Sequence, residues 1–313
     1  MARNNNGSGS LCIIGLEKSE TNLRLLEEAK RKFGSVFFVP IDAIAIGFTD
    51  KFSISYRASD LLKFDAVLPR IPQRFCSYAY QLLSLFPSDT FMSTKPISYL
   101  LADERFFMLT VLRKRGIPTL NLRLTRTTNA AMRIIGEKDF PMIIRSPEKK
   151  TGVMVKNQSE AKSIIDALTS LKHPILMEGR VKSMISVYVA NPNVLGAVRK
   201  KTDEKDIIFA KGKYKKHKLS AEEEQLALDA TKAIDTQVAR VDICTDAEPR
   251  VANIDLNPGL VSASKVIGVD MPRLVMESVH ENYKSHTERP MLIKFFEDAK
   301  SVVNDILKSK HLM

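Results

Sequence analysis

Two carboxylates and an amide stand close together in the last third of the chain. Asp242 belongs to one strand-like segment, and Asp255 and Asn257 belong to the next. Residues two apart on a strand point to the same face, so Asp255 and Asn257 project together, and a hairpin between the segments brings Asp242 beside them. Oxygen ligands of this kind suit Mg²⁺, and a cation relieves the repulsion between two carboxylates. The spacing is consistent with a magnesium site, and equally with a turn that begins at Asn257.

Basic residues dominate the charge of the chain. The 313 residues carry a formal net charge of +12, and the sequence pI of about 9.5 favours an anionic partner. Lysines crowd residues 211–218, where a solvated loop and a phosphate-binding segment are both consistent with the pattern. Charge alone does not separate a nucleotide, a nucleic acid and an acidic protein as the partner.

Cysteine usage and apolar runs indicate a cytoplasmic protein. Cys12, Cys76 and Cys244 are odd in number and lack metal-binding spacing, which predicts buried free thiols. The longest apolar run, residues 36–48, is interrupted by a proline and an aspartate, so no membrane span is expected. Residues 1–10 lack the apolar core of a signal peptide and are expected to form a disordered tail.

Apolar strands alternate with amphipathic helices, which predicts an α/β protein. After the tail we expect an N-terminal α/β domain over 11–96, a small central lobe over 97–181 and a C-terminal lobe over 182–313. Strands are expected at 11–15, 36–39, 65–69, 142–145, 153–155, 175–178, 185–190, 194–199, 238–243 and 250–256. Helices are expected at 22–33, 78–86, 103–115, 129–138, 160–171, 221–234, 272–283 and 292–307.

Several motifs resemble those of the ATP-grasp ligases, most closely the RimK-like branch. They are Val241-Asp242-Ile243, Asp255-Leu256-Asn257-Pro258-Gly259-Leu260 and Gly268-Val269-Asp270, preceded in order by Glu104-Arg105, Gly116-Ile117-Pro118, Pro141–Arg145 and Ile175–Val181. The resemblance implies an ATP-grasp fold, in which an N-terminal α/β domain precedes two α+β lobes that sandwich the nucleotide. It also implies ATP and two Mg²⁺ ions as cofactors, with Mn²⁺ as an alternative metal.

The resemblance assigns roles to residues near the metal and the adenine. Asp242, Asp255 and Asn257 are expected to hold the metal ions, with Asp255 in place of the commoner glutamate. Glu178 and the hinge backbone through Val181 are expected to face the adenine.

The phosphate-binding end departs from the family pattern. Arg105 and Arg145 stand where the family usually has two lysines that contact the phosphates. Arginine keeps the charge and adds a planar fork of donors. The loop after Arg145 keeps one glycine, Gly152, and Lys149 or Lys150 is expected to compensate by reaching the phosphates.

Three basic residues are catalytic candidates. Arg199 is expected to stabilise charge on a transferring phosphoryl group, with a surface arginine as the alternative. Lys211 and Lys213 fall in the segment that closes over phosphates or substrate in the family. Met184-Ile185-Ser186 stands where RimK-like ligases have Asp-Ile-Arg, so substrate recognition is expected to differ.

The resemblance implies an ATP-dependent carboxylate–amine ligase that acts through an acyl phosphate. It would add an amino acid, with glutamate as a candidate amine donor, to an anionic small molecule or an acidic protein. An ATP-grasp kinase with a hydroxyl acceptor and a non-catalytic module that binds nucleotide or nucleic acid are the alternatives, nucleic acid being the less favoured partner. The sequence does not determine the oligomeric state, and a homo-oligomer is consistent with it.

Overall fold

The computed structural model describes residues 9–48, 52–147, 152–201 and 213–288. The predicted site residues Lys149, Lys150 and Lys211 lie outside these ranges, as do most of the predicted tail and the helix expected at 292–307. Within the described ranges, no helix combines the length and the apolar character needed to cross a bilayer.

The N-terminal domain is built on a parallel sheet with strand order β2-β1-β6-β7. Its elements are β1 (Ser10–Gly15), α1 (Glu20–Lys30), β2 (Ser35–Pro40), β6 (Ala66–Arg70), α2 (Cys76–Ser84) and β7 (Phe91–Met92). β1 is almost continuously apolar because helices cover both faces of the sheet. Leu11 and Ile13 share a core with α1 and the C-terminal helix α9 (Met271–Glu288), whereas Cys12 and Ile14 share a core with α2.

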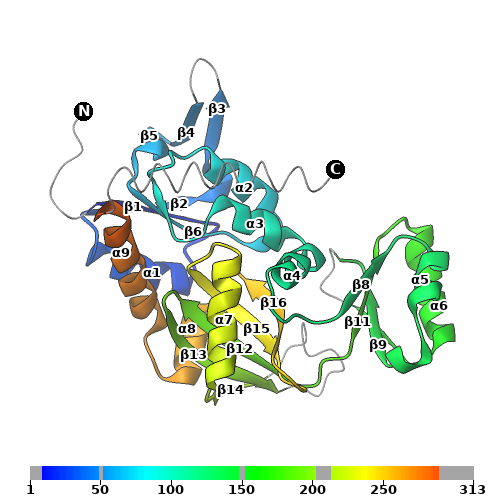
Figure 1. The fold of residues 1–313 in the computed structure, drawn as a ribbon. Helices are drawn as coiled ribbons and strands as arrows, with labels where there is room; N and C mark the ends of the chain where they lie inside the picture. Colours follow the sequence, from blue (N-terminus) through cyan, green and yellow to red (C-terminus); the bar gives the residue numbers. More distant parts are fainter. Residues whose placement is uncertain (1–8, 49–51, 148–151, 202–212, 289–313) are drawn as a thin grey trace.

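A small antiparallel sheet that the sequence did not predict projects from this domain (Figure 1). It consists of β3 (Ala45–Phe48), β4 (Phe52–Tyr56) and β5 (Ser59–Asp60). Phe48 and Phe52 stack on each other, with ring centroids 4.4 Å apart, and both rings are largely exposed.

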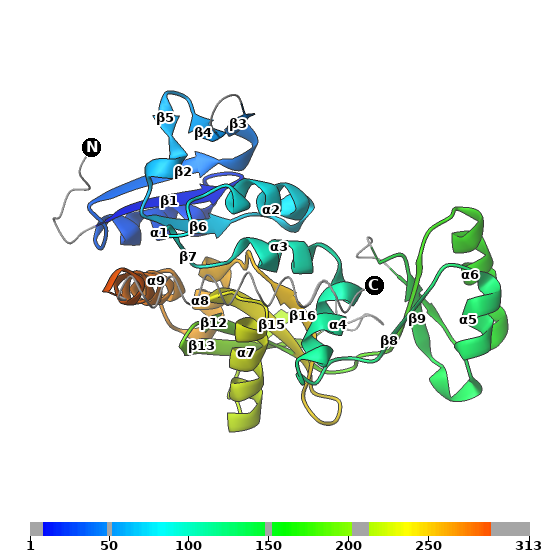
Figure 2. The ribbon, with the colours of Figure 1, turned by 45° about the horizontal axis from the view of Figure 1, so that its top comes forward.

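The central lobe is an antiparallel sheet with order β10-β9-β11-β8, and two helices cover one face. Its elements are β8 (Leu122–Thr125), α5 (Thr128–Ile134), β9 (Met142–Arg145), β10 (Val153–Val155), α6 (Gln158–Ser170) and β11 (Ile175–Gly179). The lobe extends to one side of the molecule in both views (Figures 1 and 2).

Helices α3 (Pro96–Asp103) and α4 (Arg105–Lys114) pack outside the central lobe. α3 contacts α2, and α4 contacts α3 and the C-terminal sheet, so α3 lies between the N-terminal and C-terminal sheets (Figure 2). The sheet of the central lobe therefore begins at β8, after the boundary expected at residue 97. Glu104 separates the two helices, and its carboxylate accepts hydrogen bonds from the first turn of α4.

The C-terminal lobe is a five-stranded antiparallel sheet with order β14-β13-β12-β15-β16. Its strands are β12 (Met184–Ala190), β13 (Asn193–Lys201), β14 (Lys213–His217), β15 (Val238–Cys244) and β16 (Arg250–Asp255). Helix α7 (Ala221–Ala233) covers one face, and α8 (Leu260–Ile267) and α9 cover part of the other. The boundaries of β15 and β16 agree closely with the sequence prediction.

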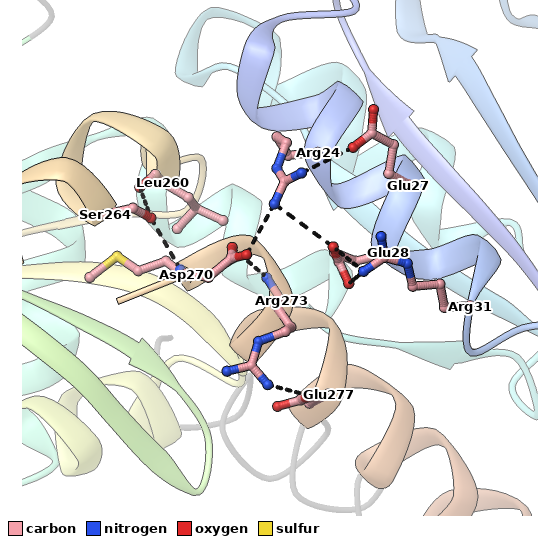
Figure 3. A network of polar contacts seen from close by, with 10 residues as sticks. Arg24, Glu27, Glu28, Arg31, Leu260, Ser264, Asp270, Arg273 and Glu277 are labelled. Carbon is pink, nitrogen blue, oxygen red and sulfur yellow. Dashed lines mark hydrogen bonds and ion pairs between the residues drawn. The ribbon is translucent and has the colours of Figure 1, made fainter. Parts of the chain in front are cut away.

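The Gly268-Val269-Asp270 motif joins the C-terminal lobe to the N-terminal domain. Gly268 ends α8 with a φ of 84°, a conformation that glycine adopts without steric cost. Oδ2 of Asp270 lies 3.0 Å from Nη2 of Arg24 on α1, and its Oδ1 accepts a hydrogen bond from the backbone N–H of Arg273 in the first turn of α9 (Figure 3). This motif therefore positions helices rather than reactive groups.

Candidate active site

A cavity of about 320 Å³ lies where the N-terminal domain, the central lobe and the C-terminal lobe meet. Its walls combine arginines, carboxylates and apolar side chains from all three parts. The lining residues that the argument uses are Cys76, Arg105, Arg145, Arg240, Asp242 and Asp255.

The central lobe presents Arg145 and Glu178 toward the C-terminal sheet. Alternate residues of β9 and β11, such as Ile144 and Met177, pack against α5 and α6, so the intervening side chains point the other way. Glu178 is 2% exposed, and its carboxylate lies 2.7 Å from Nη2 of Arg145 and 2.6 Å from Nη1 of Arg105. Nε of Arg105 also donates a hydrogen bond to the carbonyl of Ala252 on β16.

We call Arg105, Glu178 and Arg145 the upper cluster. Two guanidinium groups contact one carboxylate here in a water-poor setting, so these three side chains together have a formal charge of +1. Charges buried in this way interact more strongly than they do in water. The upper cluster is therefore suited to an anion such as a phosphate group.

Gly152, the residue before β10, lies close to the upper cluster. A Cβ at this position would lie 2.7 Å from Cγ2 of Ile143 and 3.2 Å from Nε of Arg145. The glycine therefore permits close packing on the arginine, a role that the sequence did not predict.

The C-terminal sheet presents a second polar cluster to the same cavity. Asp242 lies opposite Ser186 on β12 and Asn253 on β16, and Arg240 lies opposite Asp255. Cross-strand partners share a face, so these side chains gather on the face that α7 does not cover.

We call Arg240, Asp242 and Asp255 the lower cluster. Nε and Nη2 of Arg240 donate hydrogen bonds to the two oxygens of Asp242, at 3.0 and 3.1 Å. Nη1 of Arg240 lies 3.4 Å from Oδ2 of Asp255. Although burial disfavours the charged guanidinium, Asp242 and then Asp255 outweigh this effect and raise the pKa of Arg240 above its ordinary value.

The remaining carboxylate oxygens also have donors. The hydroxyl of Ser186 donates to Oδ1 of Asp242 at 2.6 Å, and Nδ2 of Asn253 donates to Oδ2 at 3.3 Å. The backbone N–H of Asn257 donates to Oδ1 of Asp255 at 2.9 Å. Both oxygens of Asp242 and Oδ1 of Asp255 thus accept hydrogen bonds from protein groups, and Oδ2 of Asp255 lies near Arg240.

Comparison with known proteins decides the family. The model of the RimK-like ATP-grasp domain matches residues 102–279. The chain belongs to the RimK-like ATP-grasp family. A protein of Trichodesmium erythraeum (strain IMS101) named "Probable alpha-L-glutamate ligase" is 24% identical over 289 residues, which cover 87% of this chain and 96% of that protein.

Solved structures confirm the ATP-grasp fold that the motifs predicted. The ATP-grasp ligase PsnB, complexed with a minimal precursor, matches with a TM-score of 0.69 at 15% identity, over 87% of this chain and 98% of its own. A RimK domain ATP-grasp protein from Sphaerobacter thermophilus DSM 20745 matches with a TM-score of 0.63 at 17% identity, over 86% of this chain and 99% of its own.

The RimK-like ATP-grasp domain brings Asp242 and Asp255 together as predicted, but two neighbours were missed. Arg240 and Asn253 share their face and contact Asp242, whereas Asn257 lies beyond the end of β16 and reaches Asp255 through its backbone. The rule that residues two apart share a face identifies Arg240 from Asp242. Asn257 lines the cavity, and its role as a metal ligand stays a prediction.

The structure corrects the position of Arg199 in this RimK-like ATP-grasp chain. Arg199 lies opposite Ile185, on the face that α7 covers, and its guanidinium donates to the hydroxyls of Ser183 and Thr245. Strand alternation instead places Lys200, which is 7% exposed, on the face of Asp242. Lys213 lies on the exposed edge strand β14, and its catalytic role stays a prediction.

The hinge of the RimK-like ATP-grasp domain contains Glu178 and Val181. The carboxylate of Glu178 lies between Arg105 and Arg145, and its contact with adenine stays a prediction. Val181 is buried with Met184, and contact of the hinge backbone with adenine stays a prediction.

The cysteines are free and buried, as predicted. Burial raises the pKa of Cys12 to about 12. The pKa of Cys76 also rises to about 12, through burial and then through the negative charges of Asp103 and Asp255. Thiols with such pKa values are poor nucleophiles near neutral pH.

The resemblance implies that the carboxylates of the lower cluster hold metal ions. Asp242 and Asp255 offer the hard oxygen ligands that Mg²⁺ prefers. However, Arg240 lies between the carboxylates, and the described residues contain no group of three or more His, Cys, Asp or Glu arranged to hold a metal. As they stand, these residues do not fit a metal ion that bridges Asp242 and Asp255.

Proposed function

We propose that this chain is an ATP-dependent carboxylate–amine ligase. Family membership supports the reaction class, and both PsnB and the Trichodesmium relative are named ligases. The observation that carries the proposal is the cavity in which the positive upper cluster faces the carboxylates of the C-terminal sheet. A polyanion and a reacting carboxylate can be held side by side in such a cavity, because its walls are charged and shielded from water.

The proposed reaction has two steps. An oxygen of the substrate carboxylate attacks the terminal phosphorus of ATP, and the bond to ADP breaks, which gives an acyl phosphate and ADP. The nitrogen of an amine then attacks the acyl carbon, phosphate leaves, and the nitrogen loses a proton to give an amide. The upper cluster binds phosphate oxygens through Arg105 and Arg145, and the ammonium group of Lys200 stabilises charge on the transferred group.

The amine donor that we propose to test first is glutamate. The Trichodesmium relative is named for α-L-glutamate, and PsnB was solved with a minimal precursor. A small molecule or a protein that offers a carboxylate is the proposed acceptor. The net charge of +12 favours an acidic acceptor of either kind.

The proposal is tested by incubating the full chain with Mg-ATP, glutamate and a panel of acidic peptides and small carboxylic acids. A ligase releases ADP and free phosphate in equal amounts with the amide product. A phosphorylated product without free phosphate would assign the chain to the kinases instead. Absence of ADP release above the rate without acceptor, across the whole panel, rejects the ligase proposal for these substrates.

Two lysines on opposite faces of the same sheet provide a matched pair of variants. Lys200→Met removes a charge on the face of the sheet that carries Asp242 and is expected to lower kcat about a hundredfold, because a preorganised charge is lost from the site. Lys215→Met removes a charge opposite Arg199, on the exposed edge strand, and is expected to change kcat less than about twofold. Equal effects of the two substitutions would contradict the placement of the site.

A further inference from the structure

Arg240 occupies the space between two carboxylates that the family resemblance assigns to metal ions. Its guanidinium binds both oxygens of Asp242 at 3.0 and 3.1 Å and lies 3.4 Å from Asp255. A bidentate contact of this kind fixes the direction of the arginine as well as its distance.

The backbone holds the arginine in this position. Arg240 stands two residues before Asp242 on β15 and directly opposite Asp255 on β16, so its side chain projects from the sheet between the two acids. The side chain is 28% exposed, compared with 3% for Asp242 and 32% for Asp255. A metal ion could reach the pair only by displacing the guanidinium.

The charges of the lower cluster support the same conclusion. Two carboxylates alone carry a charge of −2, and a divalent ion would be needed to balance them. With Arg240 the cluster carries −1, and the repulsion between the acids is already relieved. An additional divalent ion therefore gains less here than it would between two unpaired carboxylates.

The geometry points to Arg240 as a built-in cation that takes the place of a metal ion between Asp242 and Asp255. Nucleotide binding in this chain then depends on one metal ion fewer than the resemblance implies. This inference deepens the proposed function, and the part of it that concerns nucleotide rests on that function.

The first experiment measures Mn²⁺ binding to the full chain by electron paramagnetic resonance, without nucleotide. Arg240→Met keeps most of the apolar stem and removes the charge, and it is expected to bind Mn²⁺ at least about tenfold more tightly than the wild-type chain. Arg273→Met is the control, because it causes the same change in net charge on α9, where Arg273 pairs with Glu277. Equal Mn²⁺ affinity of the wild-type chain and Arg240→Met overturns the inference.

The second experiment measures ADP affinity by calorimetry with Mg²⁺ and with EDTA. The wild-type affinity is expected to fall less than about tenfold when the metal is removed, whereas that of Arg240→Met falls about a hundredfold. A wild-type chain that loses as much ADP affinity in EDTA as Arg240→Met does contradicts the inference. Failure to bind ADP both with Mg²⁺ and with EDTA counts against the proposed function. The Mn²⁺ experiment still decides the role of Arg240 in that case.

Discussion

The two arginines of the upper cluster line the same cavity as the lower cluster, but the two clusters differ in charge balance and burial. The upper cluster has two arginines for one carboxylate, with side chains that are 7% exposed or less. The lower cluster has one arginine for two carboxylates, and two of its three side chains are about 30% exposed. An excess of positive charge in a buried place suits a fixed anion site, whereas Arg240 already supplies the cation between the two acids of the lower cluster. The two clusters together are electrically neutral, so neither feature is visible in the overall charge of the site.

The strongest test of this difference removes the shared carboxylate of the upper cluster. Glu178→Ala leaves two buried guanidinium groups without their common partner, so we expect the free energy of unfolding to fall by about 3–5 kcal/mol. Urea denaturation followed by circular dichroism measures the change.

An exposed pair in the same lobe is the control for Glu178→Ala. Arg123 pairs with Asp139 at 2.6 Å, with side chains that are 40% and 25% exposed. Asp139→Ala is therefore expected to cost less than about 1 kcal/mol. Similar losses in the free energy of unfolding for the two variants would show that burial does not strengthen the ion pairs of the upper cluster.

The lower cluster predicts unequal roles for its two acids. Asp242 accepts hydrogen bonds from Ser186, Arg240 and Asn253, whereas Asp255 accepts one from a backbone N–H and lies farther from Arg240. We expect Asp242→Ala to lower the free energy of unfolding by about 2–3 kcal/mol, because it leaves buried donors without partners. Asp255→Ala should cost less than about 1 kcal/mol in the same urea titration. A larger loss for Asp255→Ala would reverse our assignment.

The sequence predicted the strands that carry the lower cluster, but it did not identify Arg240 and Asn253 as neighbours of Asp242. The patterns placed β15 and β16 correctly and joined Asp242 to Asp255. They did not show that β16 ends at Asp255, or that the register shifts between Asp242 and Ile243, and both features decide that Asn253 rather than Asn257 faces Asp242. Such details depend on pairing across the hairpin, which strand alternation within one segment does not specify.

The upper cluster was harder to predict because its members come from distant segments. Arg105 begins α4, and Arg145 and Glu178 meet through the pairing of β9 with β11. The motifs identified all three residues as important but gave no contact between them. Arg199 depends on pairing as well, because its position opposite Ile185 places its side chain on the face that α7 covers, and its catalytic role stays a prediction.

Gly152 offers a smaller perturbation of the upper cluster. Gly152→Ala places a methyl group against Ile143 and Arg145, and we expect a loss of about 1–2 kcal/mol from this crowding. Gly179→Ala is the matched control, since nothing lies within 4 Å of a Cβ there, and should change stability by less than about 0.5 kcal/mol. Differential scanning calorimetry compares the two variants. Equal melting temperatures would contradict the proposal that close packing on Arg145 requires a glycine at position 152.

The smallest expected effect is the pH dependence of the exposed pair. The hydrogen bond from Arg123, and then that from the N–H of Gly136, hold the pKa of Asp139 below its ordinary value. Because the folded pKa is depressed, the stabilisation is present above the unfolded pKa of about 3.9 and is lost as the pH falls through the folded value. Asp139→Asn should therefore differ from the wild-type chain at pH 7, by less than about 1 kcal/mol, and should converge with it in acid. A difference that grows at low pH contradicts this sign.

The contact between Arg105 and Glu178 also bears on how the molecule moves. Arg105 belongs to α4, which packs on the C-terminal sheet, whereas Glu178 belongs to the central lobe. Swinging the lobe outward would separate opposite charges that lie 2.6 Å apart and expose both to water. Sliding motions that preserve this contact cost less than a hinge-like opening, so the joint between the lobes acts as a latch.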